Sequence, residues 1–200
     1  MTISETISKR KSIRAYLDKP VPDGDLERII EAGRWAPNAG PFLICVIRNA
    51  ELRKTINDRT LEAMRGSGNE FLRQRASLPG YQPLYGAPVL IPLCAPDISP
   101  YASANSALAA ENMLLEATGL GYGSCFLVSP TLALNGEANL DLARQAGIPE
   151  GSSLMCAVIV GHAAAENAFS VGERVRKGSV SYIDSISDGG KEELRTPSPR

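Results

Sequence analysis

The stretch Ser8-Lys9-Arg10-Lys11-Ser12-Ile13-Arg14, close to the start of the chain, places four cations around the hydroxyl group of Ser12. It follows a segment predicted to be a short helix, with Thr2 as N-cap and Glu5 three residues later, as in a capping box. Guanidinium groups bind phosphate oxygens in a bidentate way, and lysine and serine add a point charge and a hydroxyl. The stretch therefore predicts a phosphate site. The alternative is a basic patch that contacts only solvent.

The composition is that of an ordinary globular chain. Of its 200 residues, 44% are hydrophobic and 22% are charged, which suits one sizeable core and is short for two. A net charge of −1 argues against a nucleic-acid partner bound through a broad cationic face. No apolar run has the length of a signal peptide at the start or of a membrane span elsewhere. We therefore expect a cytoplasmic protein without a membrane partner.

The cysteines and the single histidine, His162, do not form a metal-binding pattern. The four cysteines are widely separated and include no Cys-x-x-Cys pair: Cys45, Cys94, Cys125 and Cys156. A structural zinc or iron–sulfur site and a disulfide framework are both disfavoured by this spacing. We therefore predict no metal.

Apolar runs alternate with helical patterns along the chain. Buried strands are predicted at residues 42–47, 88–95, 125–128 and 153–160. One helix is predicted to begin near Asp23 or Asp25 and to end at about Arg34, and others at residues 49–64, 69–76, 103–117 and 139–145. Pro92 cannot donate to a ladder, so the second strand is expected to be exposed on one edge or bulged there. Four apolar strands interleaved with helices predict an α+β or α/β sandwich.

The predicted helix at residues 103–117 is the most apolar one. It is expected to be buried on most sides, either as a core helix or at a subunit interface. The run Gly119-Leu120-Gly121-Tyr122-Gly123 follows it and precedes a strand. A dinucleotide-binding fingerprint has the opposite order, strand before helix. We therefore interpret these glycines as a helix stop and a place of close backbone packing.

The order of several motifs resembles the nitroreductase family of flavin enzymes. The opening Arg10-Lys11-Ser12-Ile13-Arg14 is similar to the family's first motif. Later motifs follow in the family's order over about residues 6–183: Pro20-Val21-Pro22, Arg34-Trp35-Ala36-Pro37-Asn38-Ala39-Gly40, Gly86-Ala87-Pro88-Val89, Gly123-Ser124-Cys125-Phe126 and Gly147-Ile148-Pro149-Glu150-Gly151. The resemblance implies an α+β fold, a nitroreductase-like three-layer α/β/α sandwich with a central mixed, mostly antiparallel sheet in an intertwined homodimer. We expect one FMN-binding domain at residues 1–183 and a polar, disordered tail at 184–200.

The resemblance also implies a set of cofactor-binding residues. The flavin phosphate would be held at one end of the chain by Arg10, Ser12 and Arg14, and at the other by Arg176 with Arg174 or Lys177. Backbone near the isoalloxazine ring would come from the end of the third strand, at Phe126, Leu127, Val128 and Ser129. Arg14 or Lys11 would supply positive charge near N1 of the ring. For the C-terminal cations alone, the alternative is a solvated charge run.

The turn after Pro37 departs from the family pattern. Many members carry an Asn-x-Gln-Pro-Trp-type extension there, whose amide reaches the flavin, whereas this chain passes from Gly40 directly to Pro41-Phe42. Asn38 is a substitute for that amide, or it only forms a local hydrogen bond within the turn. Flavin tuning and substrate preference are therefore open.

By resemblance, the chain is an FMN-dependent oxidoreductase that uses NADH or NADPH as transient donor and reduces nitroaromatics, quinones or similar acceptors by ping-pong hydride transfer. No catalytic side chain is expected, and His162 is interpreted as structural. One alternative is a flavin-binding or regulatory dimer without efficient turnover. Another is a cysteine enzyme using Cys125, although no base or cation is adjacent to it in sequence and a buried thiol fits its apolar strand better.

Overall fold

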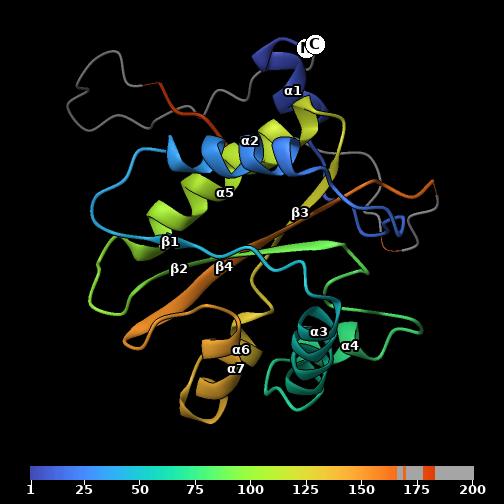
Figure 1. Ribbon diagram of the computed structural model, residues 1–200, viewed down its shortest axis with the longest axis vertical. Coiled ribbons are helices and arrows are strands. Elements are labelled where there is room, and N and C mark those ends of the chain that lie inside the picture. The colour runs from blue at the N-terminus through green and yellow to red at the C-terminus, as the bar shows by residue number, and fades with distance from the viewer. Residues whose placement is uncertain (166–168, 170–177, 183–200) are drawn as a thin grey trace, which may run out of the picture. The chain divides into compact units, whose positions relative to one another are not determined.

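The computed structural model describes residues 1–165, 169 and 178–182 (Figure 1). The chain divides into two compact units, residues 1–170 and 171–200, and all the elements below belong to the first. They are α1 (Ile3–Lys9), α2 (Asp23–Arg34), β1 (Leu43–Ile44), α3 (Ala50–Arg65), α4 (Glu70–Ala76), β2 (Val89–Pro96), α5 (Ala102–Gly119), β3 (Gly123–Leu127), α6 (Thr131–Leu134), the 3₁₀ turn η1 (Glu137–Asn139), α7 (Leu140–Gln145) and β4 (Ser152–Gly161).

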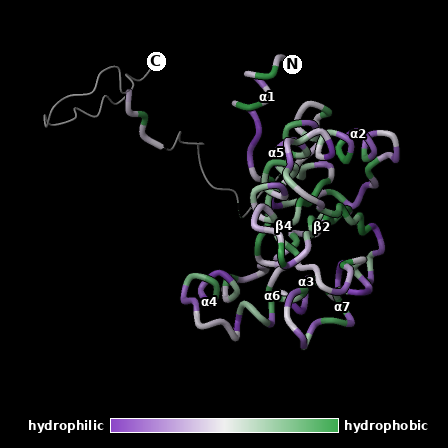
Figure 2. The backbone as a smooth tube through the Cα atoms, turned by 90° about the vertical axis from the view of Figure 1, so that its left-hand side faces the viewer, coloured by the Kyte–Doolittle hydropathy of each residue, from purple (hydrophilic) through white to green (hydrophobic). Residues whose placement is uncertain are grey.

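The strands form one sheet in the order β1-β2-β4-β3, and every neighbouring pair is antiparallel. A single parallel bridge, between Ser12 and Ser124, is added beside β3. The two central strands, β2 and β4, are buried for almost their whole length and are covered on both faces. Their continuous apolar sequences reflect that burial, and hydrophobic residues gather around them in Figure 2.

Helices cover both faces of the sheet within this unit. Alternate residues of the strands point to opposite faces, so Leu90 and Ile159 pack with α3, α4, α6 and α7, whereas Ile91 and Val158 pack with α2 and α5. Figure 1 shows the same division, with α2 and α5 on one side of the sheet and α3, α4, α6 and α7 on the other. The predicted three-layer α/β/α sandwich with a mostly antiparallel sheet is confirmed.

Helix starts were predictable where side chains cap them. Thr2 accepts a hydrogen bond from the Glu5 backbone N–H, and the Glu5 carboxylate accepts one from the Thr2 N–H, which completes the expected capping box. Asn49 and Asn69 cap α3 and α4 by accepting hydrogen bonds from the backbone N–H groups of Leu52 and Leu72. Gly121 follows α5 with a φ of +86°, as expected for a glycine that ends a helix.

Pro92 has a different consequence from the one expected. β2 is a central strand, so the predicted edge position is wrong, and the register shift lies one residue later, between Leu93 and Cys94. The Cys45 N–H donates to the Pro92 carbonyl at 2.9 Å, but Pro92 has no N–H to return the bond. The first strand, predicted at residues 42–47, therefore shortens to β1 and an isolated bridge from Ile47 to Leu90.

The apolar helix α5 has both a buried and an exposed face. Ala109, Ala110 and Met113 are fully buried in the core between α5 and the sheet. Ala107 and Leu108 are exposed, so the helix is not buried on most sides within one chain. None of the helices in residues 1–165 is both long and apolar enough to cross a membrane. The predicted tail at residues 184–200 lies outside the described residues.

Candidate anion-binding site

The basic stretch runs from the end of α1 along the outer edge of β3. The Ile13 N–H donates to the Ser124 carbonyl at 2.9 Å, and Tyr16 forms an antiparallel bridge with Ala163 after β4. Neighbouring side chains of an extended segment point to opposite sides. Ser12 and Arg14 therefore lie on one side of the segment, and Ile13 lies on the other, against Gly123.

The four cations of this stretch have different environments. Arg10 is mostly buried, and its Nε lies 3.3 Å from Oε1 of Glu111 in α5. Arg14 is half-buried and donates from Nη1 to the carbonyl oxygen of Phe169 at 3.1 Å. Lys9 and Lys11 are exposed. The surrounding structure therefore positions two arginines, whereas the lysines extend into solvent.

The Cys125 thiol lies beneath this stretch and is buried in the core. Burial raises its pKa, and a hydrogen bond with Ser12 and the charges of Arg14, Arg10 and Arg75 oppose that rise. The net effect keeps the thiol protonated and apolar in character, which disfavours a cysteine nucleophile. The positive charges of three arginines thus act on one buried sulfur atom.

The end of β3 presents alternating side chains next to the basic stretch. Phe126 and Val128 are exposed, Ser129 is half-buried, and Leu127 points into the core. Leu127 can therefore offer only its backbone to a ligand, while Phe126 and Val128 offer apolar surface as well. Ser124, which bridges to Ser12, has a buried hydroxyl group that makes no hydrogen bond within the described part of the chain.

The turn after α2 is held by an asparagine that sequence reasoning did not single out. Asn105 of α5 accepts a hydrogen bond from the Ala39 N–H at 3.1 Å and donates to the Ala39 carbonyl at 3.2 Å. Asn38 donates from its side chain to the Ala36 carbonyl at 3.2 Å, which is the local turn bond that was the alternative to a flavin contact. A polar residue within the apolar α5 pattern was the available signal for Asn105.

An aromatic cluster next to Arg14 was also missed. Tyr81 packs edge-on against Tyr85 and against Phe169, with ring centroids 5.7 Å apart in both pairs. Arg75 of α4 lies over the Tyr81 ring at 5.1 Å and donates to the Tyr85 hydroxyl oxygen at 2.9 Å. Tyr85 is the one non-glycine residue in the described ranges with a positive φ, 52°. Such strain is concentrated at functional sites.

Other predicted site residues lie outside the described ranges or away from this site. Arg174, Arg176 and Lys177 are outside the described residues, so their part stays a prediction. His162 lies with Nε2 3.3 Å from the Pro20 carbonyl oxygen and its ring against Tyr122, which supports a structural role. No group of metal-binding side chains occurs among the described residues.

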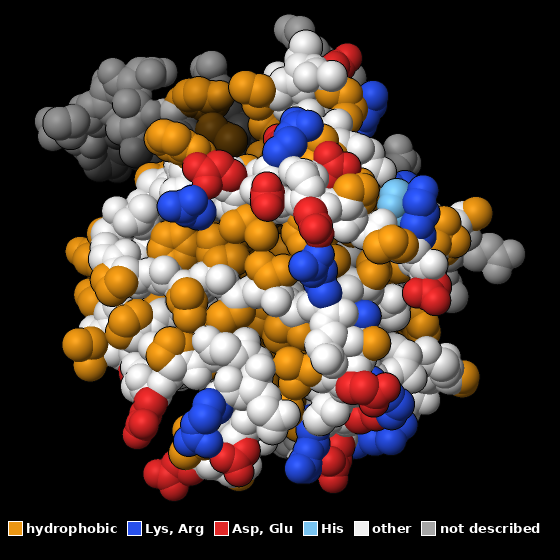
Figure 3. Space-filling view, viewed as in Figure 1, with side chains coloured by type: hydrophobic (Ala, Val, Ile, Leu, Met, Phe, Trp, Pro, Cys, Tyr) orange, Lys and Arg blue, Asp and Glu red, His pale blue; other side chains and the backbone are white. Residues whose placement is uncertain are grey.

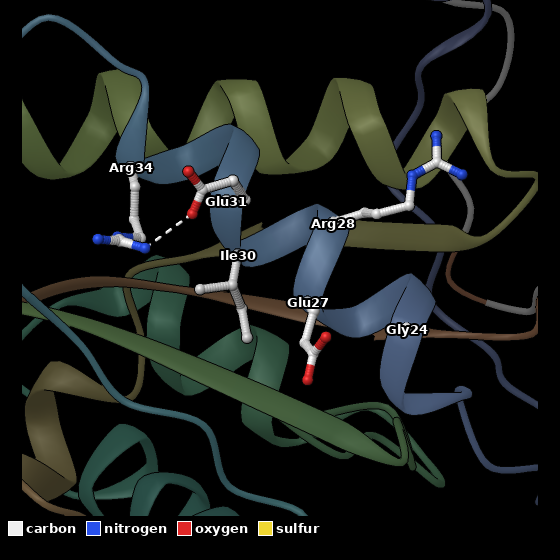
Figure 4. A pocket seen from close by; sticks show the side chains of 6 residues that line it. All are labelled: Gly24, Glu27, Arg28, Ile30, Glu31 and Arg34. Carbon is white, nitrogen blue, oxygen red and sulfur yellow. Dashed lines mark hydrogen bonds and ion pairs between the residues drawn. The ribbon is translucent and has the colours of Figure 1, made fainter.

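A shallow hollow of about 470 Å³ lies along the solvent side of α2 (Figure 4). Its walls carry charges of both signs, including an ion pair of Arg34 with Glu31 at 2.8 Å. The remaining lining residues are Gly24, Glu27, Arg28 and Ile30. Because Arg34 is paired and Glu27 adds negative charge, the hollow is poorly suited to a phosphate, and the basic stretch remains the candidate site.

Comparison with known proteins assigns the chain to a family. The model of the nitroreductase family matches residues 7–162. A protein of Archaeoglobus fulgidus named NADH dehydrogenase/NAD(P)H nitroreductase is 31% identical over 173 residues, which cover 82% of this chain and 86% of that protein.

Solved structures agree with this assignment. The structure of a nitroreductase with bound FMN from Bacteroides fragilis is 28% identical, with a TM-score of 0.75 over 94% of this chain and 98% of that one. A nitroreductase with bound FMN from Desulfitobacterium hafniense has the same coverage, a TM-score of 0.74 and 24% identity, and so shows the shared fold. The chain therefore belongs to the nitroreductase family.

Proposed function

We propose that this chain is an FMN-dependent oxidoreductase that takes reducing equivalents from NADH or NADPH and passes them to an electron-poor acceptor. Its family supports this proposal, as do the NAD(P)H nitroreductase name of the Archaeoglobus relative and the FMN bound in the Bacteroides structure. The observation on which it depends most is that Ser12 and Arg14 lie on the same side of an extended segment that hydrogen-bonds to β3.

The donor set suits a phosphate monoester. Arg10 and Arg14 supply guanidinium groups and Ser12 a hydroxyl, and all three are partly accessible. Charge-assisted hydrogen bonds of this kind are about twice as strong as neutral ones. We infer that these residues bind the FMN phosphate. Lys11, which is exposed, would add positive charge nearby. The predicted partners from the C-terminal part of the chain are Arg174, Arg176 and Lys177.

The end of β3 would orient the ring system. Phe126 and Val128 present apolar surface and the backbone of Leu127 and Ser129 presents hydrogen-bonding groups, next to the residues that would bind the phosphate. When bound, FMN supplies the hydride-transfer chemistry. The protein's part is to bind the phosphate, orient the ring and exclude water with these apolar side chains. The Asn38 amide donates to the Ala36 carbonyl within its own turn. It would bind the flavin only if that hydrogen bond were broken.

The acceptors proposed are nitroaromatics, quinones and similar electron-poor compounds, in a ping-pong mechanism. Donor and acceptor would use the same face of the ring system in turn, because both must reach the same reacting atom. No acid–base side chain is required for the hydride step. This fits the positions of His162, held by Pro20 and Tyr122, and of Cys125, which is buried.

We also propose that the active form is a homodimer. Ala107 and Leu108 of α5 are exposed in the single chain, as are Trp35, Leu43 and Val46. Apolar side chains occupy much of the middle of the face shown in Figure 3, with charged ones above and below. Exposed apolar surface of this kind is typical of interfaces. Sedimentation as a 21.3 kDa monomer would contradict the dimer.

The spectrum of the purified protein tests the function. We expect flavin absorption at one FMN per chain, bleaching on addition of NADH or NADPH without oxygen, and recovery when a quinone or nitroaromatic is added. Full FMN occupancy with no bleaching by either nucleotide would contradict the oxidoreductase and favour a flavin-binding or regulatory dimer. Colourless protein that cannot be reconstituted with FMN would contradict both.

A further inference from the structure

We propose that Arg75 of α4 is an additional guanidinium ligand of the flavin phosphate, acting together with Arg10 and Arg14. This inference rests on the proposed function, since it extends the same site. Arg75 lies in a part of the chain that carries none of the motifs resembling the family. Its assignment depends on the contacts described below.

Arg75 is positioned by aromatic groups and not by a carboxylate. Its Nη2 donates to the Tyr85 hydroxyl oxygen at 2.9 Å, and its guanidinium carbon lies 5.1 Å from the centre of the Tyr81 ring. Within the described ranges no carboxylate forms an ion pair with it. A guanidinium group held by a ring and a hydroxyl keeps donors available for an anion, because it has five N–H groups.

Arg14 and Arg75 reach the same aromatic cluster from different elements. Arg14 donates to the Phe169 carbonyl oxygen at 3.1 Å, and the Phe169 ring packs edge-on against Tyr81, the ring beneath Arg75. The Tyr16 hydroxyl is influenced by groups of both the basic stretch and the aromatic cluster. Its pKa is raised mainly by burial, and Arg14 lowers it whereas Tyr85 raises it. These interactions place α4 and the basic stretch against one cluster, although Arg14 and Arg75 are 61 positions apart in sequence.

The charges of the three arginines also converge. The charges of Arg14, Arg10 and Arg75 each oppose the rise that burial causes in the pKa of the Cys125 thiol, so the fields of all three act on the same buried atom. Glu111 offsets the charge of Arg10, whereas no carboxylate within the described residues forms an ion pair with Arg14 or Arg75. Two such cations repel each other, and a ligand with two negative charges between them removes that repulsion. A phosphate monoester near neutral pH is such a ligand.

The strained backbone of Tyr85 fits this arrangement. A positive φ at a bulky residue costs free energy and persists only when its surroundings impose it. Here the Tyr85 hydroxyl holds Arg75 while its ring packs against Tyr81 and Phe169. The strained residue thus joins Arg75, through its hydroxyl group, to the aromatic cluster that Arg14 also reaches.

Comparison of FMN with riboflavin tests the role of Arg75, because the two flavins differ only in the phosphate. Apoprotein would be titrated with each flavin while its fluorescence is followed. For Arg75→Gln we expect an FMN dissociation constant that is ~10-fold higher, from loss of one charge-assisted contact, and riboflavin binding within twofold of wild type. Arg75→Lys should retain part of the FMN affinity.

Arg73→Gln is the matched control, since Arg73 is an exposed arginine of the same helix that donates to the Ser67 carbonyl. It should leave both dissociation constants unchanged. Equal weakening of FMN and riboflavin in Arg75→Gln would overturn the inference, because it would show a packing role. Unchanged FMN binding would overturn it too, while the proposed function would stand. Failure of the wild-type protein to bind either flavin would instead overturn the proposed function, and the inference with it.

Discussion

The Ile13 side chain occupies the space in which a side chain on Gly123 would lie. A β carbon added to Gly123 would come 2.9 Å from Cγ2 and 3.1 Å from Cβ of Ile13. Both atoms belong to a β-branched side chain close to its backbone, so they cannot move away without moving the segment. This contact, together with the hydrogen bond from Ile13 to Ser124, sets the position of the basic stretch on the sheet.

Gly123→Ala is therefore expected to displace residues 12–14 from β3. Overpacking of this kind costs about 1–3 kcal/mol, and each kcal/mol lowers the melting temperature by roughly 2–4 °C at this chain length. FMN affinity should fall as well, because Ser12 and Arg14 move with Ile13. Gly119→Ala is the control, since nothing lies within 4 Å of its added β carbon. Equal stability of the two variants would contradict the close-packing role.

Arg10→Ala should remove FMN from the purified protein. Loss of a charge-assisted contact to phosphate is expected to weaken FMN binding roughly 10- to 100-fold, measured as the flavin-to-protein absorbance ratio after gel filtration. Lys9→Ala removes an exposed cation next to it and should retain the cofactor. Stoichiometric yellow flavin in Arg10→Ala would show that this guanidinium group does not bind the phosphate.

Arg176→Ala tests the predicted contribution of the C-terminal cations. If both ends of the chain contribute to one phosphate site, this variant should bind FMN about 10-fold more weakly and riboflavin with unchanged affinity, in the same fluorescence titration. Lys191→Ala, a cation further along the tail, is the control. An Arg176→Ala protein with wild-type FMN affinity would favour the alternative of a solvated charge run.

Cys45 should be the first cysteine to react with an alkylating reagent. It is half-buried, and a hydrogen bond from the Cys94 thiol lowers its pKa. Burial raises the pKa of Cys125, and raises that of Cys156 to about 12. Because only the thiolate reacts, the rate at Cys45 should rise with pH and reach its plateau at a lower pH than the rate of an unperturbed thiol. Mass spectrometry of the labelled peptides measures this.

Activity should survive the modification of Cys45, because this residue lies at the end of β1, next to Gly147, and not among the residues proposed to bind the flavin. Cys45→Ser should abolish the fast labelling phase. Fast labelling of Cys125 with loss of activity would instead revive the cysteine-enzyme alternative.

Tyr122 links α2 to the start of β3 and should make stability depend on pH in the alkaline range. Its hydroxyl donates to Oδ2 of Asp25 at 2.6 Å, and burial, with Asp25, raises its pKa to about 12. A raised folded-state pKa contributes stability that is complete below about pH 10, the value for an unfolded tyrosine, and is lost as pH rises toward 12.

Tyr122→Phe should lower the free energy of unfolding by about 1 kcal/mol near pH 8 and reduce the alkaline loss of stability. Urea denaturation at several pH values measures both effects. Tyr101→Phe, at an exposed tyrosine, serves as the comparison and should leave both unchanged. Parallel pH profiles for wild type and Tyr122→Phe would show that the Asp25 hydrogen bond does not contribute.

Local signals in the sequence were sufficient for most elements. The caps at Thr2, Asn49 and Asn69 satisfy backbone groups within a few residues, so helix starts could be identified from neighbouring residues alone. The apolar runs of β2 and β4 indicated strands buried on both faces. The prediction that the strand containing Pro92 lies at a sheet edge failed. The missing N–H of Pro92 faces the short strand β1, and the local sequence does not show which strand lies beside β2.

The sequence by itself determined the alternation of apolar strands and helices and the order of motifs that resembles the nitroreductase family. Both depend on residues that are close together along the chain. Only the tertiary structure decided that Arg10 pairs with Glu111, that Arg14 reaches Phe169 and that Arg75 holds Tyr85. The first two contacts join residues 101 and 155 positions apart, and all three depend on the packing of α4 and α5 and on the sheet register. No periodicity or spacing encodes that packing, because it results from burying both faces of the sheet at once.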